Sequence, residues 1–463
     1  MDRLSSNSRQ ASRPVRSLFV AAILLFAAIL VLFAPPAGGG QDTIFTGTNS
    51  GATSVRIAVA DFKVLGSDPQ SAAFRNTFDA TLYADLATTG IFDIVSKSLM
   101  PPGTPGAPAE IQLPSYASAP ASAAFVGFGS LNVAGGKLVV NGYLFDAKNL
   151  QYPQILAKQY SDEPTEDSAR QIAHQFADEI ILRLGGGTPG IAETKIYYSQ
   201  ASGGNKEIFV MDYDGANGHP ITHLGTISIS PRVSPDNTRV AFASLGKNGF
   251  QIRMWSLVLG RMVNFNSFGD LNQSPAWSPD GRELAYSSTR SGTPSIWISD
   301  SNGTLARRVT SFKGGDVSPA YNPRTGGQMA FISGRTGLPQ LYTMNSDGSG
   351  VQPMTDGGYV SSPSWSPNGQ VVAFAWDRKY GPGAPGGQDI YVMEVATHKW
   401  QQLTHDSGRC DFPSWSPDGR HIVYANSSDG RANHTRIWTM LADGTQQRPL
   451  TGPGADMPNW SWK

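Results

Sequence analysis

Residues 274–281 read SPAWSPDG, and similar stretches recur at 362–369 (SPSWSPNG) and 412–419 (FPSWSPDG). Three further stretches, SPRVSPDN, SPAYNPRTG and MPNWSW, keep the same proline. The six shared prolines are Pro231, Pro275, Pro319, Pro363, Pro413 and Pro458. Their separations are 44, 44, 44, 50 and 45 residues. A repeat of this length that contains several short strands is typical of a β-propeller.

Each repeat divides into four predicted strands. The repeat that begins at residue 274 contains SPAWS, ELAYSS, SIWISD and ARRVT in that order. Pro279, Asp280 and Gly281 suit the first hairpin, because proline presets φ and glycine accepts a positive φ. Asp-Gly pairs also occur in calcium loops, but the DxDxDG pattern with a distal Glu is absent from the sequence. We therefore interpret these pairs as turns.

The repeats at the two ends of this region are incomplete. KIYYS (195–199) is a second-type strand with no first strand before it, and MPNWSW (457–462) is a first-type strand with nothing after it. We expect the last strand to complete the first blade, which gives six blades closed by strands from both ends. The longest spacing contains DRKYGPGAPGG (377–387), which predicts a surface loop between the second and third strands of the fifth blade.

Large aromatic residues recur at two positions of the repeat. One position holds Trp277, Tyr321, Trp365 and Trp415. The other holds Phe242, Tyr286, Phe331, Phe374 and Tyr424. One ring per blade at a fixed place predicts packing between tilted sheets, and a stripe of aromatic ligand contacts is the alternative.

The composition narrows the class of protein. The chain has 463 residues, 40% hydrophobic residues, 51 Gly and 32 Pro, which indicates a folded, turn-rich chain of two domains. The formal net charge is zero, so we exclude nucleic-acid binding. Cys410 is the single cysteine; it is either a small buried side chain or a reactive thiol. The seven His residues form no HExxH pattern, and we expect no metal or cofactor.

The start of the chain has the pattern of an export signal. Four arginines precede the uncharged run LFVAAILLFAAILVLF (18–33), and small residues follow it. Sixteen apolar residues suit a signal-peptide core better than a membrane span of about 20 residues. We predict a signal peptide over 1–40, with an uncleaved anchor as the alternative. Export with a single cysteine favours a periplasmic location.

An α/β domain is predicted over 55–184, before the propeller at 195–463. VRIAVADF at its start is typical of a buried strand, and apolar residues every four positions from Phe74 predict a helix. Three further strands are expected before a helix that Thr165 caps. Residues 41–54 form an N-terminal arm, and the Gly-rich stretch at 185–194 is the linker.

The export signal, the domain that VRIAVADF opens, the SPxWSPDG repeats and a terminal PxWS strand together resemble the TolB family of the periplasmic Tol–Pal envelope system. The resemblance covers nearly the whole mature chain. It implies a monomeric, non-enzymatic scaffold that supports outer-membrane integrity and constriction at cell division. The implied partners are a Pal-like peptidoglycan-associated lipoprotein on the propeller and a TolA-like inner-membrane protein on the N-terminal arm.

The resemblance also implies binding residues. In the family, the Pal surface involves residues just before the SP pair of the inner strands, which we expect in loops at one mouth of the channel. The matching residues here are Leu271, Asn272, Gln273, Ser274, Asp316, Val317, Tyr359, Val360 and Asp411. In the arm they are Asp42, Thr43, Ile44 and Phe45. The alternative for each residue is an ordinary solvated turn.

Two other functions are considered for the same repeats. Prolyl-oligopeptidase-like hydrolases carry similar blades, but they need a G-x-S-x-G nucleophile elbow, and the sequence contains none. A small-ligand or metal-binding propeller would need inward carboxylates or His. The inner strands here offer mostly Ser, Pro, Ala and Trp. The scaffold is therefore the favoured hypothesis.

Overall fold

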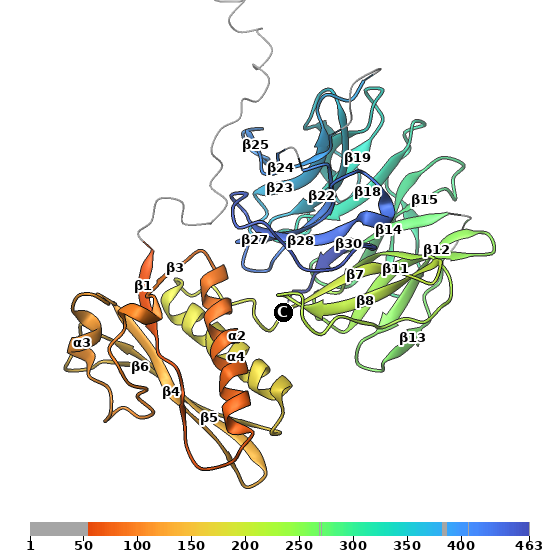
Figure 1. Cartoon of the computed structure of the whole chain (residues 1–463). Coiled ribbons are helices and arrows are strands. Elements are labelled where there is room, and N and C mark those ends of the chain that lie inside the picture. Colours follow the sequence, from red (N-terminus) through yellow and green to blue (C-terminus); the bar gives the residue numbers. More distant parts are fainter. Residues whose placement is uncertain (1–53, 268, 270, 382–386, 406, 463) are drawn as a thin grey trace, which may run out of the picture.

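The computed structural model describes residues 54–462, apart from 268, 270, 382–386 and 406 (Figure 1). The predicted signal peptide at 1–40 and the arm residues Asp42, Thr43, Ile44 and Phe45 lie outside the described residues. Within the part of the chain that is described, no helix combines the length and apolar character needed to cross a membrane.

The N-terminal part is a mixed β-sheet with two long helices on one face, which confirms the predicted α/β domain (Figure 1). The strand order is β3-β1-β4-β5-β6, with β2 paired to β4. The strands are β1 (Val55–Val59), β2 (Lys63–Val64), β3 (Phe92–Ile94), β4 (Phe125–Ala134), β5 (Lys137–Asp146) and β6 (Gln154–Asp162). The helices are α2 (Ser71–Thr88), η1 (Lys97–Leu99), α3 (Leu113–Ala117) and α4 (Glu166–Leu184).

The two long helices follow the predicted periodicity. Phe78 and Leu82 of α2 are fully buried in one core with Phe176 of α4. Thr165 caps α4 as predicted, because its Oγ1 accepts a hydrogen bond from the backbone N of Ser168 at 3.0 Å. The short helix α3 was not predicted; its few apolar residues cover the opposite face of the sheet.

Six four-stranded sheets make up the rest of the chain, which confirms the six-bladed propeller. Blade 1 contains β30 (Ala455–Trp460), β7 (Lys195–Ser202), β8 (Asn205–Asp212) and β9 (His219–Pro220). Blade 2 contains β10 (Ser228–Val233), β11 (Arg239–Gly246), β12 (Gly249–Ser256) and β13 (Arg261–Val263), and blade 3 contains β14 (Asn272–Trp277), β15 (Glu283–Ser288), β16 (Ser295–Asp300) and β17 (Arg307–Arg308). Blade 4 contains β18 (Asp316–Tyr321), β19 (Gln328–Ser333), β20 (Gln340–Asn345) and β21 (Gln352–Pro353). Blade 5 contains β22 (Tyr359–Trp365), β23 (Val371–Asp377), β24 (Asp389–Glu394) and β25 (Trp400–Gln402). Blade 6 contains β26 (Arg409–Trp415), β27 (His421–Ser427), η2 (Ala432–His434), β28 (Arg436–Leu441) and β29 (Arg448–Pro449).

The last strand closes the ring as predicted. β30 pairs antiparallel with β7, and Trp460 lies opposite Ile196 in the register. The backbone N of Ser461 donates a hydrogen bond to the Lys195 carbonyl at 2.8 Å, which continues the pairing beyond the strand. Blade 1 is therefore built from both ends of the propeller sequence, and β30 covers the edge that β7 would otherwise leave unpaired.

Every inner strand carries a β-bulge just before its proline. The register shifts once between each inner strand and its neighbour, at the same place in all six blades. The residue before the proline has φ between 53° and 55° in each blade, although none of these residues is glycine. They are Ser230, Ser274, Ser318, Ser362, Phe412 and Met457. The residue before the shared proline and the proline itself thus mark a bulge inside the inner strand.

A buried polar network joins the two domains. Asp85 of α2 accepts a hydrogen bond from the Tyr213 hydroxyl at 2.5 Å and lies 2.8 Å from Nδ1 of His174 on α4. Tyr213 belongs to the propeller, directly after β8. All three residues are more than nine-tenths buried. At a second contact, Nε2 of His421 lies 2.8 Å from the Thr88 carbonyl.

Asp178 of α4 binds the end of the linker, directly before the first propeller strand β7. Its Oδ1 accepts a hydrogen bond from Ala192 N at 3.0 Å, and its Oδ2 accepts one from Glu193 N at 3.2 Å. Burial raises the pKa of Asp178 to about 7, and the charges of Asp85 and Glu193 add to the increase. The carboxyl is therefore more easily protonated in the folded chain than in the unfolded chain.

This pKa shift predicts a pH-dependent stability. A raised folded-state pKa contributes stability at low pH that is lost as the pH rises through about 7. From this group we expect the free energy of unfolding to fall by about 2 kcal/mol between pH 5 and pH 8. Urea unfolding at both values should show that Asp178→Asn is relatively more stable at pH 8 than at pH 5. The exposed Asp162→Asn is the control, and an equal effect of Asp178→Asn at both pH values would contradict the prediction.

Candidate functional site: the two mouths of the propeller channel

The six inner strands surround a central channel and define its two mouths. They are β10, β14, β18, β22, β26 and β30. We name the mouth where these strands begin the strand-start mouth, and the mouth where they end the strand-end mouth. The N-terminal domain touches the propeller on the strand-end side, because His421, which contacts Thr88, follows the turn after β26.

The propeller residues predicted from the family resemblance gather at the strand-start mouth, in the four consecutive blades 3 to 6. Their predicted position in loops is wrong for all but one of them, because only Leu271 precedes its strand. The other eight lie within the strands, in the half before the proline. They are Asn272, Gln273, Ser274, Asp316, Val317, Tyr359, Val360 and Asp411. Each inner strand begins before its proline, because the strand pairs with its neighbour on both sides of the bulge.

Several of these residues are buried and hold the mouth together. Asn272 is fully buried, and its Nδ2 donates to Gln251 Oε1 at 3.1 Å. Asp316 is fully buried and forms a two-point ion pair with Arg335, at 2.6 and 3.1 Å. Such pairs fix the direction of the strands, because a buried charge without its partner is costly. Because both side chains are fully buried, Asn272 and Asp316 support the mouth and are not part of its exposed surface.

Asp411 and Val360 belong to the same supporting group. Asp411 is 5% exposed and accepts hydrogen bonds from Ser361 Oγ in the neighbouring blade at 3.0 Å and from Arg409 at 3.1 Å. Val360 is fully buried in an apolar cluster with Trp376. These contacts link blades 5 and 6 at the mouth.

The remaining residues are open to solvent at this mouth. Tyr359 is 38% exposed, and its ring lies 5.5 Å from the ring of Tyr380, centroid to centroid. Leu271, Gln273, Ser274 and Val317 are partly exposed. The exposed residues among those predicted therefore present uncharged polar groups and an aromatic edge on a rigid ring, a surface suited to protein contact.

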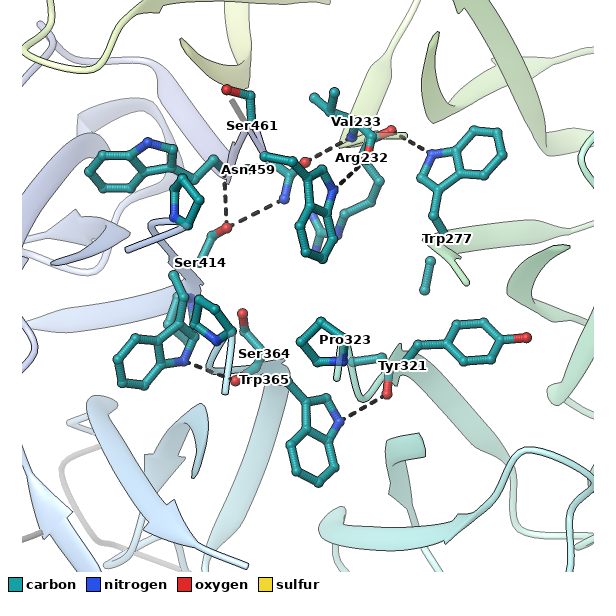
Figure 2. A pocket seen from close by; sticks show the side chains of 18 of the residues that line it. Arg232, Val233, Trp277, Tyr321, Pro323, Ser364, Trp365, Ser414, Asn459 and Ser461 are labelled. Carbon is teal, nitrogen blue, oxygen red and sulfur yellow. Dashed lines mark hydrogen bonds between the residues drawn. The ribbon is translucent and has the colours of Figure 1, made fainter. Parts of the chain in front are cut away.

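The strand-end mouth is lined by aromatic rings that also form hydrogen bonds (Figure 2). The Nε1 atoms of Trp277, Trp365 and Trp415 each donate to a backbone carbonyl of the preceding blade, at 3.0, 3.1 and 3.2 Å. Each ring is 6% exposed, which confirms the predicted packing role. The hydrogen bonds between blades were not predicted, since only the tertiary structure brings each indole to its carbonyl.

The residue between the proline and the aromatic position also lines this mouth in every blade. These six residues are Arg232, Ala276, Ala320, Ser364, Ser414 and Asn459. Figure 2 shows Arg232 and Asn459 on one side of the central space and Ser364 on the other. Sequence reasoning missed this set. The signal was available in the aligned repeats, where one copy has Arg and the other five have shorter residues.

The single cysteine, Cys410, is a free thiol inside blade 6. Cys410 is fully buried, and burial raises the pKa of its thiol to about 11, which confirms the interpretation as a small buried side chain. Among the described residues, no three His, Cys, Asp or Glu side chains come together as metal ligands.

The protein-family model described as "TolB beta propeller domain" matches residues 183–463 of the sequence. The chain belongs to the TolB family. The TolB amino-terminal domain matches residues 48–151 as well, so both parts of the fold have a TolB counterpart.

Individual TolB proteins are similar to this chain over part of their length. The "Protein TolB homolog" of Chlorobium luteolum (strain DSM 273 / BCRC 81028 / 2530) is 30% identical over 306 residues, which cover 63% of this chain and 64% of that protein. The homolog of Chlorobium chlorochromatii (strain CaD3) is 31% identical over 290 residues, 62% of each chain. The chain thus spans less than two thirds of these relatives. The crystal structure of TolB from Acinetobacter baumannii has the same fold, with a TM-score of 0.72 and 23% identity over 89% of this chain and 97% of that one.

Proposed function

We propose that this chain is a non-enzymatic, periplasmic component of a Tol–Pal system that binds a Pal-like lipoprotein at the strand-start mouth. The observation that carries the proposal is TolB family membership over both domains, combined with an exposed, rigid mouth. A further relative, from Gluconobacter oxydans (strain 621H), is named "Tol-Pal system protein TolB" and is 28% identical over 352 residues, 65% of this chain and 74% of that protein.

The geometry of the strand-start mouth supports a protein partner. Tyr359 of blade 5 offers an exposed aromatic ring next to Tyr380, and Gln273 of blade 3 offers an amide two blades away on the same mouth. Aromatic residues on a rigid frame are typical anchors of protein interfaces, because they contribute contact area with little loss of side-chain entropy. The buried Asp316–Arg335 pair lies in β18 and just after β19, where it keeps the frame in register.

A second contact belongs to the same proposal. A TolA-like inner-membrane protein would bind the N-terminal arm at 41–54, and the two contacts together would support outer-membrane integrity and constriction during division. The support is the family membership, since the arm residues Asp42 to Phe45 lie outside the described residues. Deletion of the arm should abolish TolA binding and leave Pal binding in place.

Calorimetric titration of the protein with the soluble domain of the same organism's Pal-like lipoprotein tests the proposal. We expect saturable one-to-one binding that the double variant Gln273→Ala/Tyr359→Ala weakens at least tenfold, which corresponds to about 1.4 kcal/mol. The control is Leu305→Ala, because Leu305 is 87% exposed and lies in the turn after β16, on the strand-end side.

The outcomes separate the partner from the site. Binding that both variants leave unchanged would keep the partner and overturn the strand-start mouth as its site. The absence of binding at tens of micromolar, with the protein shown to be folded by circular dichroism, would overturn the Tol–Pal proposal itself.

A further inference from the structure

At the strand-end mouth, the residues after the six shared prolines form a ring of one cation and five short side chains. The residue after the shared proline is Arg232 in blade 2, and it is Ala, Ala, Ser, Ser and Asn in the other five blades. All six residues line the same cavity (Figure 2). Because the five other side chains are short, the ring leaves space at its centre, and Arg232 is the longest side chain of the six.

Among the described residues, no negative charge balances Arg232. The described residues that line the cavity include no Asp, Glu, Lys or His, so Arg232 is the one charged residue among them. Within the described parts of the chain, no carboxylate forms an ion pair with it, and its Nη1 donates to its neighbour's carbonyl, Pro231 O, at 2.8 Å. Burial lowers the pKa of Arg232 to about 10, so the guanidinium remains protonated at neutral pH.

Arg232 is half-buried. A half-buried cation without a counter-ion is unfavourable, because the cavity replaces only part of the hydration that water would give. A guanidinium presents five N–H donors, and one bond to a backbone carbonyl leaves most of them for another acceptor. Paired hydrogen bonds from a guanidinium to a carboxylate are the strong, specific form of this contact. The Arg232 guanidinium is therefore able to pair with an anionic group that enters the cavity.

The size and chemistry of the cavity limit what could complete the pair. About 130 Å³ is open to the centres of water-sized molecules, enough for a small group but not for a folded domain. One positive charge matches a monoanion better than a phosphate dianion. The opposite wall supplies the hydroxyl of Ser364 for hydrogen bonding, while Ala276 and Ala320 suit a short carbon skeleton.

We propose that the strand-end mouth is a binding site for a single carboxylate, carried by a small organic acid or by the end of an extended peptide, with Arg232 as the group that pairs with it. The site lies at the opposite end of the channel from the proposed Pal surface. It does not depend on the Tol–Pal proposal.

Titration of the purified protein with sodium acetate tests the site, with sodium chloride at matched ionic strength as the reference. Five tryptophans line the cavity, namely Trp277, Trp365, Trp415, Trp460 and Trp462, so tryptophan fluorescence reports its occupation. We expect a saturable fluorescence change and a rise in the thermal midpoint with acetate. Arg232→Gln should weaken the apparent affinity at least tenfold, and Arg232→Lys should retain part of it.

A stability measurement separates binding from a structural role. In buffer without carboxylates, Arg232→Gln should be at least as stable as the wild type, because the substitution removes a half-buried charge that no carboxylate among the described residues pairs with. A purely structural arginine would instead make Arg232→Gln less stable under all conditions. That result, or an acetate response that is absent from the wild type or equal in both proteins, would overturn the proposal.

Further arms of the titration identify the source and the class of the anion. N-acetyl-dialanine carries a carboxylate at the end of a peptide, and its amide is the uncharged control. Tighter binding of the peptide acid than of acetate would assign the site to peptide ends, and equal binding would assign it to small acids. Tighter binding of inorganic phosphate than of acetate, or equal binding of the peptide acid and its amide, would overturn a carboxylate site.

Discussion

Trp460→Ala should lower the free energy of unfolding by about 4 kcal/mol, the usual cost of removing a buried tryptophan side chain. Trp460 is 3% exposed in the closing strand β30 and packs with Ile196 of β7. Its Nε1 donates to Thr194 Oγ1 at 2.7 Å, and its backbone N donates to Ser414 Oγ of blade 6 at 3.0 Å. One side chain thus joins the two ends of the ring.

Urea unfolding measures this loss, and hydrogen exchange shows where the ring opens. The matched control is Trp277→Ala, which removes an equivalent ring from blade 3, away from the closure. Both variants should be destabilised, but only Trp460→Ala should speed exchange of the β7 amides that pair with β30. A loss below about 1 kcal/mol for Trp460→Ala would contradict a closing role, since surface substitutions reach only about 0.5 kcal/mol.

Asp85→Ala should cost about 3 to 4 kcal/mol and weaken the coupling between the two domains. The substitution leaves the Tyr213 hydroxyl and His174 Nδ1 without the carboxylate that each contacts. Among the described residues, His174 Nε2 already makes no hydrogen bond, so the ring has no second partner to compensate. Burial raises the pKa of Asp85 above its ordinary value, whereas the contacts with His174 and Tyr213 lower it. These two contacts therefore favour the charged form of the carboxylate.

Differential scanning calorimetry should show the loss of coupling as a split of one transition into two, because the propeller no longer stabilises the N-terminal helices. Tyr213→Phe removes only the hydroxyl and should cost about 1 kcal/mol. Asp93→Ala is a control on an exposed carboxylate, whose pair with Arg56 should contribute less than about 1 kcal/mol. If Asp85→Ala and Asp93→Ala have equal effects, the network does not join the domains.

The repeat determined the propeller because its signals are local. Four short strands and their turn residues recur in each copy, so the number of blades follows from counting. The closure by MPNWSW was also predictable, since an incomplete first blade and an unpaired last strand complement each other. The cap at Thr165 and the helix face at Phe78 are similarly local and were predicted correctly.

The candidate sites were predicted less well because they depend on which side chains remain exposed. Asn272 stands three residues before its proline and is fully buried, whereas Tyr359 stands four residues before its proline and is 38% exposed. A shift of one residue along a strand moves the side chain to the other face of the sheet. The residue three before the proline is fully buried in all six blades: Ser228, Asn272, Asp316, Val360, Cys410 and Ala455. The family resemblance alone did not separate these supporting residues from surface residues.

The sequence by itself therefore determined the α/β domain, the six blades, their closure and the family. Only the tertiary structure decided the bulge before each proline, the indole bonds between blades, the Asp85 network and the ring of short residues around Arg232. The physical reason is distance along the chain. Turns and strand periodicity are set by neighbours a few residues apart, whereas burial and charge pairing are set by residues from different blades or domains.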